Sequence, residues 1–262
     1  MTTCLAMLIR LKFLRLDFQS PRLLLNRSQR AQPLMRALLP SLTWLEFAGV
    51  NEYMEDLAAR IKAPLLDNIN IRFFEQIVFD ISQLSQFIAC AEKLNFPSQA
   101  KVYFHSDFVE ILLSPSSGAA GNLTLQVSCT TSDGQVSAMA QICHRASPLL
   151  SGVGRLEIDG GRMGKGLRAF SMAGAFIPVH RRGESAYHRA PGPLVASALR
   201  EVTRATAAEV LPALRSLLLE KPEPSEFVEG AIRRFIKMRG PSKHPVAVFR
   251  QQSDWEDDLW GA

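Results

Sequence analysis

The stretch LPSLTWLEF, residues 39–47, returns far down the chain as LPALRSLLL, residues 211–219, with Leu-Pro-x-Leu-x-x-Leu in the same register. A wider pattern, Leu-x-x-Leu-x-Leu with aliphatic or Phe replacements, has its apolar positions at Leu11-Leu14-Leu16, Leu42-Leu45-Phe47, Leu66-Ile69-Ile71, Val153-Leu156-Ile158 and Leu214-Leu217-Leu219. The last two positions alternate along a short strand and point to one side, while the first anchors the turn that leads into it. The repeated phrase therefore predicts a repeated strand unit.

The stretches between these strands have helical spacing. A strand of this kind cannot bury its apolar face alone, so units stack into a curved parallel sheet backed by helices, with about 20–29 residues per repeat in regular examples. Asn51 is a plausible N-cap for the first helix, and the expected helices are 51–61, 80–94, 134–146 and 225–241. Segments 100–113 and 121–129 read as further strands. The predicted fold is α/β, an irregular leucine-rich-repeat-like solenoid.

Two regions interrupt the repeat pattern. Residues 160–193 are rich in Gly, Arg and His and are too long for an ordinary connection, so we expect a loop or disorder there. Residues 251–262 are acidic with two tryptophans and no period, which favours a frayed terminus over a docking motif. The predicted organisation is repeat units over 1–159, the insertion 160–193, C-terminal repeat units over 194–250 and the acidic tail 251–262.

Composition and charge narrow the functional classes to which the protein can belong. The chain has 262 residues and a net charge of +5, with acidic residues interleaved among the basic ones, which argues against a nucleic-acid-binding protein. Its four cysteines show no paired short spacing, so we expect reduced thiols in the cytoplasm or nucleus. Basic residues interrupt the apolar start MTTCLAMLIRLKFLRL too early for a membrane span, which leaves a buried strand or, as the less favoured reading, a mitochondrial presequence.

Candidate catalytic patterns are weak. In DGGRMGKGLR, residues 159–168, Asp159 stands where a phosphate loop has its first Gly, and Gly166 stands where Ser or Thr would bind magnesium. Cys143 and His144 are neighbours, but adjacent helical residues point in different directions, which favours a buried thiol beside a surface imidazole. The remaining histidines lack metal-ligand spacing. We expect no enzyme, cofactor, metal or small-molecule substrate.

The segments 39–74, 79–88, 209–220 and 244–250 together resemble the leucine-rich-repeat portion of the F-box-like protein family of basidiomycete fungi. Members of that family join an F-box helical segment, which docks on the Skp1 adaptor of a ubiquitin ligase, to a repeat domain that selects the protein to be modified. No segment of the Leu-Pro-x-Glu-Leu-Leu type precedes the first repeat in this sequence. The resemblance thus implies a substrate-recognition protein, with Skp1 binding by this chain alone not expected.

Stacked parallel strands would align their outward side chains in columns. We expect columns running Phe13, Trp44, Asn68, Arg155, Ser216, then Arg15, Glu46, Asn70, Glu157, Leu218, then Asp17, Ala48, Arg72, Asp159, Glu220. Phe13 and Trp44 would be exposed neighbours unless the register slips by one residue. The predicted partner-binding residues are Phe13, Arg15, Trp44, Glu46, Asn70, Arg72, Arg155 and Glu157.

The function expected from these features is a non-enzymatic protein–protein interaction scaffold that does not enter membranes. Its protein partner is unknown. The alternatives are an RNA- or anion-binding protein that uses the basic segment 160–193, and an enzyme of unrecognised type.

Overall fold

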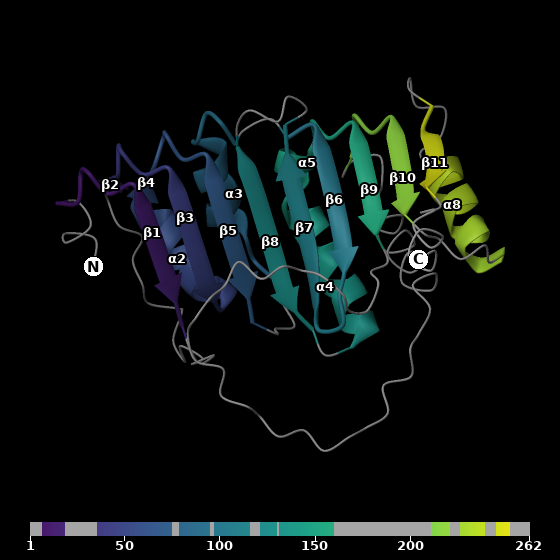
Figure 1. The fold of residues 1–262 in the computed structure, drawn as a ribbon, viewed down its shortest axis with the longest axis horizontal. Coiled ribbons are helices and arrows are strands. Elements are labelled where there is room, and N and C mark those ends of the chain that lie inside the picture. Colours follow the sequence, from purple (N-terminus) through teal and green to yellow (C-terminus); the bar gives the residue numbers. More distant parts are fainter. Residues whose placement is uncertain are drawn as a thin grey trace, which may run out of the picture.

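The computed structural model describes residues 7–18, 36–74, 79–94, 97–115, 121–129, 131–159, 211–220, 226–238 and 245–251. Within them, nine strands form one sheet in the order β1-β3-β5-β8-β7-β6-β9-β10-β11 (Figure 1). The strands are β1 (Phe13–Asp17), β3 (Trp44–Gly49), β5 (Asn68–Phe73), β6 (Gln99–Phe104), β7 (Phe108–Ser114), β8 (Asn122–Ser128), β9 (Arg155–Asp159), β10 (Ser216–Glu220) and β11 (Ala247–Gln251). The molecule is a mixed α/β protein with a large, mostly parallel sheet.

One strand departs from the predicted parallel arrangement. β7 runs antiparallel to both β6 and β8, whereas every other neighbouring pair in the large sheet is parallel. β6, β7 and β8 form a meander whose last strand returns to pair with β5, while its first strand pairs with β9. The expectation of a wholly parallel sheet is therefore wrong, because short connections join β6 to β7 and β7 to β8 and reverse the chain at each of them.

The same backbone turn leads into five of the strands. In each turn, the first apolar residue of the repeated sequence pattern donates its N–H to the carbonyl three residues earlier. The donor–acceptor pairs are Leu11–Leu8 at 3.0 Å, Leu42–Leu39 at 3.3 Å, Leu66–Ala63 at 3.3 Å, Val153–Leu150 at 3.1 Å and Leu214–Leu211 at 3.2 Å. This turn explains the spacing of the pattern. The residue that closes the turn lies just before the strand, and it is apolar because its side chain faces the core.

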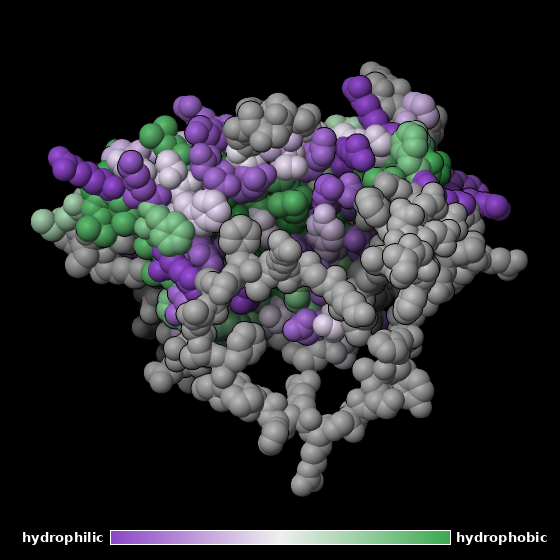
Figure 2. Space-filling view, in the orientation of Figure 1, coloured by the Kyte–Doolittle hydropathy of each residue, from purple (hydrophilic) through white to green (hydrophobic). Residues whose placement is uncertain are grey.

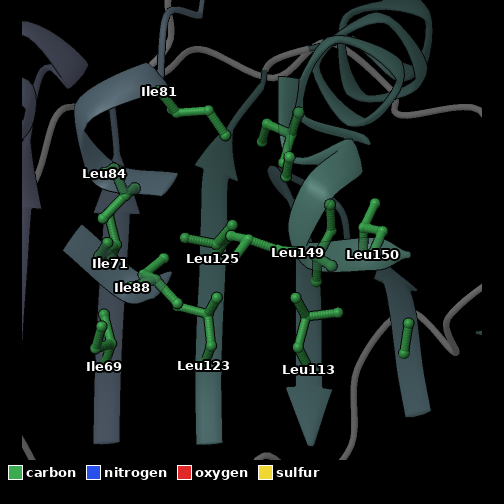
Figure 3. Packing of buried hydrophobic residues seen from close by; sticks show 14 of the residues in the cluster. Ile69, Ile71, Ile81, Leu84, Ile88, Leu113, Leu123, Leu125, Leu149 and Leu150 are labelled. Carbon is green, nitrogen blue, oxygen red and sulfur yellow. The ribbon is translucent and has the colours of Figure 1, made fainter. Parts of the chain in front are cut away.

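The strands place the next apolar residues in the core. Leu45 pairs with Ile69, and Leu156 pairs with Leu217, in adjacent parallel strands. All four side chains are buried. Figure 3 shows how helices cover this side. Leu84 and Ile88 of α3 (Ser82–Ala89) approach Ile71 and Leu123, and Leu149 of α5 (Ser147–Leu150) lies near Leu125 and Leu113, with Leu150 on the side of β7 away from β8.

Further helices line the same side of the sheet. α2 (Asn51–Arg60) follows β3, α4 (Ser132–Arg145) follows β8, and α8 (Glu226–Met238) precedes β11 (Figure 1). A small parallel sheet pairs β2 (Ala37–Leu38) with β4 (Ile61–Lys62). The four sequence-predicted helices are thus present; α2, α3 and α8 are shorter than predicted, whereas α4 begins two residues earlier and ends one residue earlier. None of the described helices has both the length and the apolar character that crossing a membrane requires.

The start of α2 differs from expectation. Val50, not Asn51, occupies the N-cap position, and no side chain caps that end. The buried Asn51 instead donates from Nδ2 to the carbonyl of Asp80 at 2.6 Å. This bond ties the start of α2 to the chain just before α3, so the predicted local cap is replaced by a contact between consecutive units.

Candidate partner-binding face

The side of the sheet opposite helices α2, α3 and α5, called here the front face, carries the outward-pointing side chains. Strand alternation places these side chains, most of them polar, in three rows that cross the strands. The register pairs the middle row as Arg15, Glu46, Asn70, Thr124, Leu112, Lys101, Glu157, Leu218 and Phe249. The row at the carboxyl ends of the parallel strands reads Asp17, Ala48, Arg72, Gln126, Glu110, Tyr103, Asp159, Glu220 and Gln251.

These rows correct the predicted columns. Asn70 pairs with Thr124 of β8, and Glu157 pairs with Lys101 of β6, so Asn70 and Glu157 are not neighbours. The meander separates β5 from β9. Six of the predicted binding residues therefore lie together on β1, β3 and β5, while Arg155 and Glu157 lie apart on β9.

The two aromatic residues at the start of β1 and β3 are neighbours. Phe13 and Trp44 are direct register partners, with ring centroids 6.3 Å apart and an interplanar angle of 29°. Phe13 is 50% exposed and Trp44 is 41% exposed, so the register does not bury Trp44. Figure 2 shows hydrophobic surface at this end of the sheet. Two large rings held in contact at a surface offer apolar area at a small cost in side-chain entropy.

Charged and polar groups lie next to this pair. Arg15 contacts Asp17 at 3.4 Å and Glu46 at 3.9 Å, in both cases between a guanidinium nitrogen and a carboxylate oxygen. Together with Asn70 and Arg72 they line a hollow of about 20 Å³, enough for one or two water molecules. Small-molecule sites are typically about 300–1,000 Å³. The hollow is thus a surface feature and does not suit a metabolite.

A hydrogen-bonded chain continues across the centre of the front face. Arg72 Nε donates to Gln126 Oε1 at 3.3 Å, and Gln126 Nε2 donates to Glu110 Oε1 at 3.2 Å. His105 Nε2 lies 3.7 Å from Glu110 Oε2, and the imidazole stacks on Phe108 with centroids 4.0 Å apart. His105 is the main cause of the lowered pKa of Glu110, against the opposing effect of burial; Gln126 and Arg72 add to the lowering. The centre of the face is therefore a connected polar network.

Glu157 differs from its predicted setting. Its side chain is 7% exposed, although the columns placed it on a solvated surface. Lys101 Nζ contacts Glu157 Oε1 at 2.8 Å, and Arg155 lies 3.9 Å from Oε2. A carboxylate removed from water needs such partners, because an unpaired buried charge is strongly unfavourable. Glu157 therefore acts as an internal ion-pair partner and is poorly placed to meet another protein.

The described residues include some of the catalytic candidates considered in the sequence. They contain no group of three His, Cys, Asp or Glu side chains arranged to hold a metal ion. Burial raises the pKa of the Cys143 thiol to about 12, so it is not a thiolate nucleophile at neutral pH. His144 beside it is exposed. The phosphate-loop-like residues 160–168 and the basic segment 160–193 lie outside the described residues, as does the acidic tail 252–262.

The meander contributes residues that the sequence interpretation missed. Lys101, Glu110 and Gln126 belong to the same face as Arg15 and Arg72. Their signal was present, because polar residues alternate with apolar ones in KVYF and in NLTLQVS. The sequence did not predict that these residues lie between β5 and β9, because strand order depends on contacts between residues far apart in the sequence.

No family model matches the chain, and neither the curated proteins nor the solved structures contain a match to it. The resemblance to fungal F-box-like proteins therefore rests on the sequence segments quoted above.

Proposed function

We propose that this protein is a non-enzymatic protein–protein interaction scaffold of irregular leucine-rich-repeat type, and that it recognises a protein destined for a ubiquitin ligase. The proposed setting is the cytoplasm or nucleus, where the free thiols of Cys90, Cys129 and Cys143 would persist. The five equivalent turns and the in-register leucines support the repeat interpretation. The ligase connection rests on the family resemblance.

The proposal rests on the exposed Phe13–Trp44 pair, which lies beside Arg15 and Glu46. Interfaces take most of their affinity from a few residues, and tryptophan and arginine are enriched among these. The charges around the pair already contact one another, which fixes their side chains before a partner arrives. A partner would bury the rings at the centre of the contact and leave the charges at its rim.

The test is replacement of Trp44 by Ala in the full chain, after partners have been identified by capture from the source organism and mass spectrometry. We expect the dissociation constant of a captured partner to rise at least about fivefold, equivalent to about 1 kcal/mol. The melting temperature should remain nearly unchanged, because Trp44 is 41% exposed.

Phe249 provides the matched control. It is an aromatic residue on the front face, 55% exposed, but it lies on β11 at the opposite edge of the sheet. Phe249→Ala should leave the same partner's affinity intact. Equal losses in both variants, or a large fall in melting temperature for Trp44→Ala, would rule out the aromatic pair as the binding centre.

A further inference from the structure

A second exposed surface lies where β1, β3 and β5 begin (Figure 1). We call it the rim and define it as residues 7–12, 36–43 and 61–66, the segments that precede these strands. Ser41 Oγ donates to the carbonyl of Ile9 at 2.8 Å, and Leu39 N donates to the carbonyl of Lys62 at 2.8 Å. Leu38 and Lys62 are register partners in β2 and β4. The three segments therefore form one continuous surface.

The rim exposes large apolar side chains. Exposures range from 45% to 81% among five residues, namely Met7, Leu8, Ile9, Leu38 and Leu65. Ile9 and Leu65 lie within the turns that lead into β1 and β5. Single exposed leucines are ordinary, but a group on one continuous surface marks a contact site.

The rim is also basic. Its three segments contain Arg10, Lys12, Arg36 and Lys62 and no acidic residue. Arg10, Lys12 and Lys62 are exposed and form no ion pair with any residue in the described part of the chain. Unpaired positive charge around apolar side chains favours an occupant that is both acidic and apolar.

The sequence of this protein contains such an occupant. Residues 254–260, Asp-Trp-Glu-Asp-Asp-Leu-Trp, hold four acidic residues, two tryptophans and no basic residue. This segment lies outside the described residues and follows β11, which ends at Gln251. Its charge and its apolar side chains complement those of the rim.

The distance from the end of β11 to the rim determines whether the segment can reach the rim of its own chain or only the rim of a second molecule. β1 and β11 are the two edges of the nine-stranded sheet, so eight spacings of about 4.8 Å, or roughly 38 Å, separate them. Trp255 is four residues beyond Gln251, and four extended residues span at most about 14 Å. The nearest rim segment, residues 61–66 before β5, is six spacings or roughly 29 Å from β11. Trp255 and the acidic residues around it therefore cannot reach the rim of their own chain, so the segment as a whole cannot lie along it.

We propose that the acidic segment 254–260 of one copy binds the rim of a second copy, giving head-to-tail self-association. Such a contact joins two different surfaces, so each copy keeps a free rim or a free tail and the assembly can extend. Lys12 and Lys62 attract the carboxylates, and Ile9, Leu38 and Leu65 receive the tryptophans. This inference is independent of Trp44 and of the proposed ligase partner.

The test is sedimentation velocity of the full chain from about 1 to 100 μM, a range that detects micromolar association. The average mass should rise with concentration and fall again in high salt, since salt screens the ion pairs. A rim-reversed variant, Lys12→Glu with Lys62→Glu, and a tail-reversed variant, Asp254→Lys with Asp257→Lys, should each weaken association at least about tenfold. Mixing the two variants should restore association, because the carboxylates introduced at positions 12 and 62 of one variant can then meet the ammonium groups introduced at positions 254 and 257 of the other.

Arg215→Glu is the matched control. Arg215 is an exposed basic residue directly before β10, the position that Lys12 holds before β1, and it should not affect association. A wild-type chain that stays monomeric at 100 μM, an equal loss from Arg215→Glu, or no recovery on mixing would each overturn the proposal. Binding of the monomer to phosphatidylserine vesicles through Lys12 and Lys62 would also overturn it and would identify the rim as a lipid-binding surface.

Discussion

Glu55 shows how one side chain joins two consecutive units. Its carboxylate accepts the backbone N–H groups of Gln83 and Leu84, each at 2.8 Å, and the hydroxyl of Ser82 at 3.3 Å. These are the first residues of α3, whose N–H groups have no partner within the helix. Burial, assisted by the nearby charge of Asp80, raises the pKa of Glu55 despite these hydrogen bonds. A residue of α2 thus caps α3.

Replacement of Glu55 by Ala should lower the free energy of unfolding by about 1–3 kcal/mol, because it leaves two backbone donors without an acceptor. Urea unfolding monitored by circular dichroism measures the change. Glu52→Ala, in the first turn of the same helix, is the control and should cost about 0.5 kcal/mol or less. Equal effects of the two substitutions would contradict the capping role.

Glu110 should make stability depend on pH. Its pKa is lower in the folded chain than the ordinary value of 4.5, chiefly because of His105. The folded state therefore holds the proton less readily than the unfolded state, so the contribution to stability is complete above about pH 4.5 and disappears as the pH falls through the lowered pKa. Urea titrations from pH 6 to pH 3 should show the stability of the wild type falling towards that of Glu110→Gln. A constant difference between the two proteins across this range would refute the pairing.

Neighbouring residues of β10 face opposite sides of the sheet. Leu217 is fully buried in register with Leu156, whereas Ser216 lies half-buried on the front face. Leu217→Ala should cost about 2–5 kcal/mol, since it leaves a cavity that the surrounding core fills only in part. Ser216→Ala should change stability by less than about 0.5 kcal/mol. Urea midpoints that coincide for the two variants would mean that the inward face of β10 is assigned wrongly.

Local sequence patterns predicted most of these elements. The spacing of Leu42, Leu45 and Phe47 indicated both the turn and the strand, because those positions depend on residues only a few places apart. The orientation of β7 was not predictable, since alternating apolar residues look the same in parallel and antiparallel strands. The environments of Asn51 and Glu157 were also missed, because Asp80 and Lys101, their partners, are distant in sequence.

The meander explains why the predicted columns failed. It places three strands between the units of β5 and β9, so the front face is longer than a simple stack of the five pattern-bearing strands would make it. The aromatic pair lies at the β1 end, and the His105–Glu110 network occupies the centre. Partner binding centred on Trp44 would therefore leave Arg155 and Glu157 outside the contact. Substitutions of Arg155 or Glu157 should then change the stability of the fold and not the affinity for the partner.

Recruitment to a ubiquitin ligase must be tested on the whole chain. In the family that the sequence resembles, an F-box segment docks on Skp1, and these 262 residues contain no Leu-Pro-x-Glu-Leu-Leu segment. We therefore expect that the purified chain and a Skp1-type adaptor, mixed at about 10 μM each, elute separately in size-exclusion chromatography, because affinities weaker than this do not hold a complex through the column. A fusion that places an F-box segment before residue 1 should co-elute with the same adaptor. Co-elution of the unfused chain would show that the strand and helix units themselves contact Skp1, and recognition of a substrate would then need a surface other than the one that binds the adaptor.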